Sequence, residues 1–476
     1  MKLRNYQEDL IEKLRTSLLK KNKKMILCAP TGSGKTVMFS FMVKKHIEKG
    51  GRVLVLTHRK ELMKQSGGTF HSFGLDPEFI SANNKTPDLT KTLHVSMIET
   101  FNRRLSDYQL FLSHKTMIVI DEAHINSFTK IFHLINENQI VVGATATPYR
   151  KGKDIPALEM FYQDLIQGVQ VADLIKLGFL SKPKTYGVKV DLSKAKLKGD
   201  DYDTSQLYSE TKLYKGVYLN YAKISYGKKT MIFASNVANS IEVCREFNDN
   251  GVLAKHIDAN TPSKDRESIL DWFENTDNAV LCNCGILTAG YDHSEIETII
   301  LYRATTSLPL FLQMCGRGSR VSDSKKEFNI LDFGNNVRRL GFWEENRTWS
   351  LKKDKKRTAK EDAFPVKDCP ECDAMLPVST KVCPYCDYYF KKTDKEKEQD
   401  EIAELQLLTK KEVSKFASKR DVDLWVKLVH AKKLHPFRIF HMLEPNEIDL
   451  AYEFMEKIGY KKGFAYLNKN RFRVFG

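Results

Sequence analysis

The chain has 476 residues, which is enough for two or three domains that each bury a core. Hydrophobic residues make up 42% of it, as in a globular protein, and no run approaches the roughly 18 apolar residues of a membrane span. The formal net charge of +16 predicts a polyanionic partner, nucleic acid first, unless the charge serves solubility alone. The charged N-terminus lacks the pattern of a signal peptide, so we expect a cytoplasmic protein with reduced cysteines and no membrane partner.

Residues 3–20 are predicted to form a helix, because apolar side chains recur on one face at helical spacing. Gln7 lies in this helix, shortly before a glycine-containing loop. An exposed glutamine is usually only solvated, but at this place its amide could instead read the edge of an adenine. Both readings stay open for Gln7 taken alone.

The loop that follows has the pattern of a phosphate-binding loop (P-loop). An apolar strand over 25–28 leads into the turn Ala29–Thr36, and a helical run over 37–43 comes next. The general pattern begins with Gly where this chain has Ala29, and a chance turn is the plainer alternative. In a P-loop, backbone N–H groups point at phosphates, Lys35 reaches the β- and γ-phosphates of ATP, and Thr36 binds Mg²⁺. The predicted nucleotide-binding residues of this turn are Thr31, Gly32, Ser33, Gly34, Lys35 and Thr36.

Polar residues also stand at the ends of the next two predicted strands. Thr57 and Arg59 follow the apolar run 53–56, and Ser96 lies in a second such place, 95–100. Ligands of open α/β sheets bind beyond the carboxyl ends of the strands. We therefore expect these three side chains to meet a phosphate backbone.

A pair of carboxylates follows the apolar strand 117–120, in Asp121-Glu122-Ala123-His124. Two adjacent carboxylates at a strand end are costly unless a cation neutralises them. Asp121 can hold Mg²⁺ and Glu122 can orient and deprotonate an attacking water. An ordinary acidic helix start is the alternative, which the upstream P-loop disfavours.

A further strand, 140–142, leads into a turn that contains Thr145 and Thr147. Their hydroxyls can hydrogen-bond neighbouring acidic groups and pass a phosphate-dependent shift onward, or they simply end a strand. The alternation of strands and helices through residue 150 predicts a doubly wound, mostly parallel sheet.

A second α/β series follows a polar connecting insertion at 193–215. We predict strands at 230–233, 252–257, 279–282 and 298–302, and helices at 237–250 and 262–275. A last helix carries Gln313, Gly316, Arg317 and Arg320, which share one face at helical spacing. If this domain packs over the first, both arginines face the γ-phosphate as arginine fingers; otherwise they belong to a solvated basic helix.

The order of these motifs resembles superfamily 2 helicases over about residues 1–340. The resemblance is carried by Gln7, the turn 29–36, Asp121 to His124, Thr145 to Thr147, Gly290 with Asp292, and Gln313 to Arg320. It implies two RecA-like domains, 1–182 and 183–350, with ATP and Mg²⁺ between them and nucleic acid across both. It further implies nucleotide contacts from Gln7, Gly290, Asp292 and Gln313, and nucleic-acid contacts from Thr145, Thr147 and Thr288.

Finer features favour DNA over RNA. Thr145-Ala146-Thr147, together with the DEAH tetrad and Gln313, is more similar to DNA translocases than to DEAD-box RNA helicases. The segments 301–320 and 331–335 resemble bacterial RadD-type repair helicases and phage branch-migration helicases. Those proteins commonly have Ala-Pro after the aspartate that corresponds to Asp292, whereas this chain has His293-Ser294.

The C-terminal third begins with a basic linker, 351–366, and continues with a predicted zinc ribbon, 367–390. Cys369, Cys372, Cys383 and Cys386 form two C-P-x-C knuckles, which can donate four thiolates to a tetrahedral Zn²⁺ at about 2.3 Å. Four protein ligands leave no open position, so the site should be structural. Asp373 and Asp387 follow the knuckles at positions that often need a left-handed backbone.

Residues 391–476 are predicted to be a helical, basic region, with Leu424, Trp425, Leu428 and Val429 in its core. The last twenty residues contain no Asp or Glu and interleave basic with aromatic side chains. These could contact phosphates and stack on unpaired bases, or they could form a small packed subdomain with a charged rim.

These patterns together predict an ATP- and Mg²⁺-dependent DNA helicase or translocase in a bacterial or phage-infected cell. Its partners would be single-stranded, forked or branched DNA, in branch migration, recombination or repair, with repair or single-strand-binding proteins as further partners. Two alternatives remain: an RNA-stimulated ATPase of the same fold, and a nucleic-acid-binding module that ATP switches without unwinding.

Overall fold

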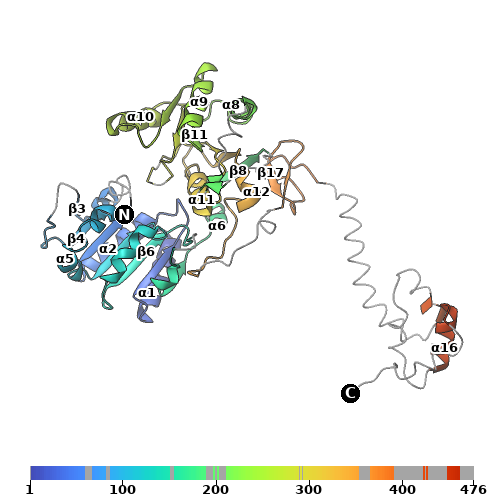
Figure 1. Ribbon diagram of the computed structural model, residues 1–476, viewed down its shortest axis with the longest axis horizontal. Coiled ribbons are helices and arrows are strands. Elements are labelled where there is room, and N and C mark those ends of the chain that lie inside the picture. The colour runs from blue at the N-terminus through green and yellow to red at the C-terminus, as the bar shows by residue number, and fades with distance from the viewer. Residues whose placement is uncertain are drawn as a thin grey trace. The chain divides into compact units, whose positions relative to one another are not determined.

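A computed structural model represents the protein (Figure 1). It describes residues 2–58, 67–81, 86–150, 155–188, 197–198, 201–202, 211–288, 290–291, 293–352, 365–390, 422–423, 425–426 and 448–460. The predictions for Arg59, Asp292, Leu424, Leu428, Val429 and the residues after 460 lie outside these ranges. The chain divides into two compact units, Met1–Tyr388 and Tyr389–Gly476.

Seven parallel strands form the first sheet, in the order β3-β4-β2-β5-β6-β1-β7. The strands are β1 (Lys24–Cys28), β2 (Val53–Thr57), β3 (Glu78–Ile80), β4 (Leu93–Met97), β5 (Met117–Asp121), β6 (Ile140–Thr145) and β7 (Asp164–Gln167). The helices are α1 (Asn5–Leu19), α2 (Lys35–Ile47), α4 (Ile98–Asn102), α5 (Gln109–Ser113) and the 3₁₀ segments η1 (Asn126–His133) and η2 (Leu158–Met160). Helix α6 (Val171–Lys176) follows β7 but packs through Leu174 on the core of the second sheet.

The apolar runs of this sheet are buried on both faces, because successive side chains of a strand point to opposite sides. Met25 and Leu27 of β1 join a core with α1 and α2, while Ile26 joins a second core with α4, α5 and η1. Figure 1 shows α1 and α2 beside this sheet. The continuous hydrophobic strands of the sequence therefore form a sheet that helices cover on two sides.

Six parallel strands form the second sheet, in the order β12-β13-β11-β14-β15-β8. They are β8 (Lys182–Gly187), β11 (Thr230–Ala234), β12 (Ala254–Ile257), β13 (Val280–Cys284), β14 (Thr298–Tyr302) and β15 (Glu327–Asp332). The helices are α8 (Thr211–Ile224), α9 (Val237–Asp249), α10 (Ser263–Asn275), α11 (Leu308–Gly316) and α12 (Asn336–Leu340), and the connecting insertion contains a hairpin of β9 (Leu197–Lys198) and β10 (Asp201–Tyr202). The predicted fold class, two doubly wound parallel-sheet domains, is confirmed.

One predicted element is wrong in its extent. Helix α11 ends at Gly316, so Arg320 does not share a helical face with Gln313. Glycine is a poor helix former, and the sequence Gly316-Arg317-Gly318 places two of them together. A Cβ at Gly318 would also collide with the Phe328 ring, so the chain there packs closely on β15. Arg320 lies beyond the helix, outside any helix or strand.

The four-cysteine segment forms a small ribbon with the antiparallel strands β16 (Val366–Asp368) and β17 (Met375–Pro377). β16 thus starts within the predicted linker. The ribbon is attached to the second sheet, because the Tyr385 hydroxyl donates a hydrogen bond to the Pro183 carbonyl at 2.7 Å. Lys182 and Lys184 lie 4.7 and 5.2 Å from the centroid of the Tyr385 ring.

The second unit contains α16 (Ile448–Lys457) among its described residues. Trp425, a predicted core residue, is buried against the edge of the Phe454 ring, with the ring centroids 5.9 Å apart. No helix in the described ranges is both long and apolar enough to cross a membrane.

Candidate nucleotide site

The P-loop leaves β1 after Cys28 and enters α2 at Lys35. Gly32 and Gly34 have φ values of 87° and 80°, in the left-handed region that favours glycine. A Cβ at Gly34 would lie 2.6 Å from Nε2 of Gln7, so a larger residue would not fit there. The Lys35 ammonium donates a hydrogen bond to the Pro30 carbonyl at 3.4 Å, and it therefore lies over the loop.

Gln7 is buried and held against this loop, and both ends of its amide are engaged by backbone groups, so its contact with an adenine stays a prediction. Its Nε2 donates to the Ser33 carbonyl at 2.9 Å, and its Oε1 accepts from the Arg4 backbone N–H at 2.9 Å. The Tyr6 hydroxyl donates to the same Ser33 carbonyl at 2.9 Å. Tyr6, a buried residue of α1, thus also holds the loop in place.

Asp121 ends β5, and Glu122 follows it with a left-handed φ of 53°. Both side chains are buried, and the Asp121 carboxylate accepts a hydrogen bond from the Glu122 N–H at 3.0 Å. Burial and the Glu122 charge raise the pKa of Asp121 to about 7. Burial opposes ionisation of Glu122 too, but Lys35, His124, His58 and Arg317 lower its pKa overall.

This donor set fits a divalent cation with a nucleotide. Two adjacent buried carboxylates face the positive charge of Lys35, and Oε2 of Glu122 accepts no hydrogen bond from any described residue. A magnesium ion prefers carboxylate, hydroxyl and phosphate oxygens. Asp121 and Thr36 are the side chains that would hold it.

His124 connects the carboxylates to the turn after β6. Its Nδ1 lies 2.8 Å from Oγ1 of Thr145 and 3.4 Å from Oε2 of Glu122. Oγ1 of Thr145 in turn accepts from the N–H of Thr147 at 3.0 Å. The Thr145 hydroxyl was expected to bond an acidic group directly, and the structure instead places His124 between Thr145 and Glu122.

The second domain adjoins the P-loop through the end of α11 and the residues that follow it. A Cβ at Gly32 would lie 3.0 Å from Nη1 of Arg320, and a Cβ at Gly316 would lie 2.8 Å from Cγ2 of Thr31. The backbone of Arg320 is fixed by a hydrogen bond, because its carbonyl accepts from the Ser181 hydroxyl at 2.8 Å. The structure thus brings Arg320 of the second domain to a glycine of the P-loop in the first.

Arg317 is placed differently from Arg320. Its guanidinium donates to the Thr288 carbonyl at 2.8 Å and to the Tyr291 carbonyl. Its charge still lowers the pKa of Glu122. Of the other predicted nucleotide contacts in this domain, Gly290 has a left-handed φ of 80° and Gln313 is buried in α11.

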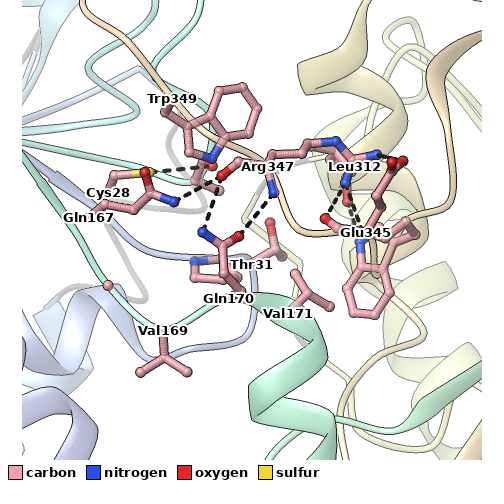
Figure 2. Close-up of a pocket in the computed structure, with 14 residues that line it drawn as sticks. Cys28, Thr31, Gln167, Val169, Gln170, Val171, Leu312, Glu345, Arg347 and Trp349 are labelled. Atoms are coloured by element: carbon pink, nitrogen blue, oxygen red, sulfur yellow. Dashed lines mark hydrogen bonds and ion pairs between the residues drawn. The ribbon is translucent and has the colours of Figure 1, made fainter. Parts of the chain in front are cut away.

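A strap, residues 341–352, runs from the second domain back to the first (Figure 2). The Arg347 carbonyl accepts from Nε2 of Gln167 at 2.9 Å and of Gln170 at 3.1 Å. Trp349 packs against the cores of both domains. A cavity of about 30 Å³ lies between the strap and the P-loop, which is room for about one water molecule.

The predicted nucleic-acid contacts that the structure describes all have buried side chains. These are Thr57, Ser96, Thr145, Thr147 and Thr288. The Ser96 hydroxyl donates to the Met97 carbonyl at 3.2 Å, and the Thr145 hydroxyl is engaged by His124. These residues are therefore covered by other parts of the chain, backbone included, in this structure.

The four cysteines of the ribbon gather as predicted. Their sulfur atoms all lie within 4.8 Å of one another, with 3.5 Å between Cys369 and Cys386 and 3.7 Å between Cys372 and Cys383. A tetrahedral ion with metal–sulfur bonds of about 2.3 Å would need sulfur separations of about 3.8 Å. Asp373 and Asp387 have φ values of 56° and 58°, which confirms the left-handed turn after each knuckle.

Two residues near the acidic pair carried no motif that singled them out. His58 follows Thr57 and helps to keep Glu122 ionised. Arg150 is buried behind the DEAH turn and donates to three of its carbonyls. Both lie within three residues of a predicted motif, but their partners are far away in the chain.

The protein has two RecA-like sheets, with a P-loop in the first and an arginine of the second against it, and this is the architecture of a nucleoside-triphosphatase. Residues 1–150 match the family described as type III restriction enzyme, res subunit, and residues 212–322 match the helicase conserved C-terminal domain. Residues 367–392 match an uncharacterised protein family, UPF0547.

Relatives agree with this assignment. A 51.5 kDa protein of Lactococcus phage (isolate 7-9) is 31% identical over 81% of this chain and 82% of its own length. The putative ATP-dependent helicase IRC3 of Saccharomyces cerevisiae is 32% identical over 70% of this chain, but the match spans only 51% of the yeast protein. A fragment of a putative HsdR subunit of a type I restriction enzyme from Vibrio vulnificus shares the fold, with a TM-score of 0.57 at 20% identity, over 71% of this chain and 65% of that one. The chain belongs to the superfamily 2 helicases, whose activity on nucleic acid is ATP-dependent.

Proposed function

We propose that this protein is an ATP- and Mg²⁺-dependent DNA translocase or helicase that acts on branched or damaged DNA. The observation that carries the proposal is the approach of Arg320 to Gly32, because it joins the two domains at the P-loop. A motor of this kind needs a nucleotide that both domains contact, so that hydrolysis changes how the domains sit.

The chain's residues would divide the chemistry as follows. Lys35 and the P-loop amides bind the phosphates, and Gln7 positions the base. A bound Mg²⁺, held by Thr36 and Asp121, would neutralise charge on the phosphates. Glu122, ionised at neutral pH, accepts the proton of the attacking water.

Arg320 stabilises the negative charge that develops on the transferred phosphoryl group. Arg317 would act as a second finger only after it exchanges its contacts with the carbonyls of Thr288 and Tyr291 for phosphate. Because Arg317 bonds these carbonyls, a change in its contacts on nucleotide binding would also move the loop that carries Gly290.

Two features support DNA as the polymer: the Thr145-Ala146-Thr147 turn with the DEAH tetrad, and the match to the restriction-enzyme family. The net charge of +16 supports a nucleic-acid partner of either kind. The phage relative supports action in the cytoplasm of a bacterial or phage-infected cell. Repair or single-strand-binding proteins are proposed as further partners. An RNA-stimulated ATPase, or a module that ATP switches without unwinding, stays the alternative.

The test is ATP hydrolysis with single-stranded, duplex, forked and four-way DNA beside RNA, together with strand-displacement and branch-migration assays. We expect forked or four-way DNA to stimulate hydrolysis most and strands to be displaced. Lys35→Ala and Glu122→Gln should abolish the stimulated rate, whereas Lys49→Ala, an exposed lysine just beyond α2, should keep it. Stimulation by RNA alone, or binding without displacement, would favour an alternative, and near-normal turnover in both active-site variants would reject the site.

A further inference from the structure

The turn that carries Glu122 has a conformation that needs outside support. Glu122 has a left-handed φ of 53°, which L side chains adopt at a cost and which persists only where the surroundings enforce it. Two local contacts help: the Glu122 N–H donates to the Asp121 carboxylate at 3.0 Å, and the Ile125 N–H donates to the Glu122 carbonyl at 2.9 Å. Neither contact involves the carbonyls of Ala123, His124 or Ile125.

Arg150 donates hydrogen bonds to those three carbonyls. Its Nε donates to the His124 carbonyl at 2.8 Å, and its Nη2 donates to the carbonyls of Ala123 and Ile125, each at 3.1 Å. Its Nη1 donates to the Pro156 carbonyl at 3.4 Å. The planar fork of a guanidinium suits such a set of acceptors, whereas a lysine ammonium is a single point of charge.

We propose that Arg150 is a positioning residue for ATP hydrolysis, which holds the DEAH turn so that Glu122 faces the attacking water. This inference rests on the proposed role of Glu122 as the base. Arg150 lies three residues after Thr147 in the chain. Its hydrogen bonds to the carbonyls of residues 123–125 therefore also connect the threonine turn to the DEAH turn.

A direct contact of Arg150 with nucleic acid is the competing role for a basic residue beside this motif. Only 7% of Arg150 is exposed, and its guanidinium is occupied by four carbonyls and lies 5.5 Å from the centroid of the Phe161 ring. A phosphate contact would require these bonds to break. The observations therefore favour an internal role.

The experiment compares Arg150→Met and Arg150→Lys in the full chain by DNA-stimulated kcat, affinity for a fluorescent ATP analogue, DNA affinity at several salt concentrations, and Tm. Because a small displacement of a catalytic group can cost orders of magnitude in rate, we expect Arg150→Met to lower kcat at least about tenfold. We expect Arg150→Lys to restore part of that loss. The affinity for the analogue should stay within about threefold, and the salt dependence of DNA binding should not change.

Phe101→Leu is the matched control for lost stability, since Phe101 is buried in the core that covers this face of the sheet and its ring contacts are with Tyr108 and Phe111. It should lower Tm and keep kcat. If Arg150→Met does not fold, the test rests on Arg150→Lys. We expect its kcat to be at least about threefold lower than that of the wild type, because an ammonium lacks the planar fork of the guanidinium. The proposal is overturned if kcat of the folded Arg150 variants stays normal while Glu122→Gln is inactive, or if Phe101→Leu loses as much kcat. Normal turnover in Glu122→Gln would instead reject the proposed function itself.

Discussion

At the scale of the residue, Lys115 shows how far burial can change a charge. It is 1% exposed, just before β5, and its Nζ lies 2.8 Å from Nδ1 of His94. Nε2 of His94 lies 2.9 Å from the Asp88 carbonyl and 2.9 Å from the Glu78 carboxylate. Burial, with a smaller contribution from Arg52, lowers the pKa of Lys115 to about 8.

A lowered lysine pKa makes stability depend on pH in a definite direction. Between about pH 8 and the ordinary lysine pKa of about 10.5, the unfolded chain binds more protons than the folded one. The free energy of unfolding therefore increases as the pH rises through this window. Relative to Lys115→Met, the wild type should gain about 1–3 kcal/mol across this window. Denaturation curves at several pH values measure the gain. The free energy of unfolding of Lys20→Met, a surface variant, should change with pH as that of the wild type does. The same pH dependence in Lys115→Met and the wild type would contradict the prediction.

Residues in local motifs were predictable, and residues that act through distant partners were not. Lys35, Asp121 and the four cysteines have neighbours in the chain whose types and spacing define their chemistry. Arg150 and Lys115 have no such neighbours, because their partners come from other strands and turns. The side chains of Thr57 and Ser96 were expected to face nucleic acid and are instead buried, since a strand end does not reveal what covers it.

At the scale of the element, the strands were predicted well and the ends of helices less well. Continuous apolar runs predicted most strands of the two sheets, but β3, β7, β8 and β15 were not predicted. Helix α11 was predicted to extend to Arg320, and the close packing of Gly318 on β15, which ends it, is a tertiary contact. The strap 341–352 carried no pattern at all, because its contacts with Gln167 and Gln170 join residues far apart in the chain.

The ribbon offers a test of its own. Its sulfur separations fit a tetrahedral Zn²⁺, which we propose as the resident metal, and metal binding of this kind contributes folding free energy. Elemental analysis should find about one zinc per chain. Cys372→Ser should lose the zinc and expose residues 365–390 to proteolysis, while Cys284→Ser, outside the cluster, should keep both zinc and protection. A metal-free wild type with a protected ribbon would show that the sulfurs need no ion.

At the scale of the whole molecule, motifs from both halves of the first compact unit meet at the P-loop. Gln7, Lys35 and the acidic pair come from the first sheet domain, and Arg317 and Arg320 come from the second. The order of the motifs predicted this convergence through the resemblance to superfamily 2 helicases. The finer resemblance to RadD-type and branch-migration helicases, the linker residues 353–364 and the basic C-terminal segment stay predictions.

The most direct test of the account is the effect of Arg320→Ala on ATP hydrolysis. Arginine fingers contribute about 10³–10⁵ in rate in well-studied NTPases, so we expect DNA-stimulated kcat to fall at least about a hundredfold while ATP is still bound. Arg245→Ala, an exposed arginine of α9 in the same domain, should keep the wild-type rate. A kcat for Arg320→Ala within about twofold of the wild type would contradict a nucleotide site shared by the two domains.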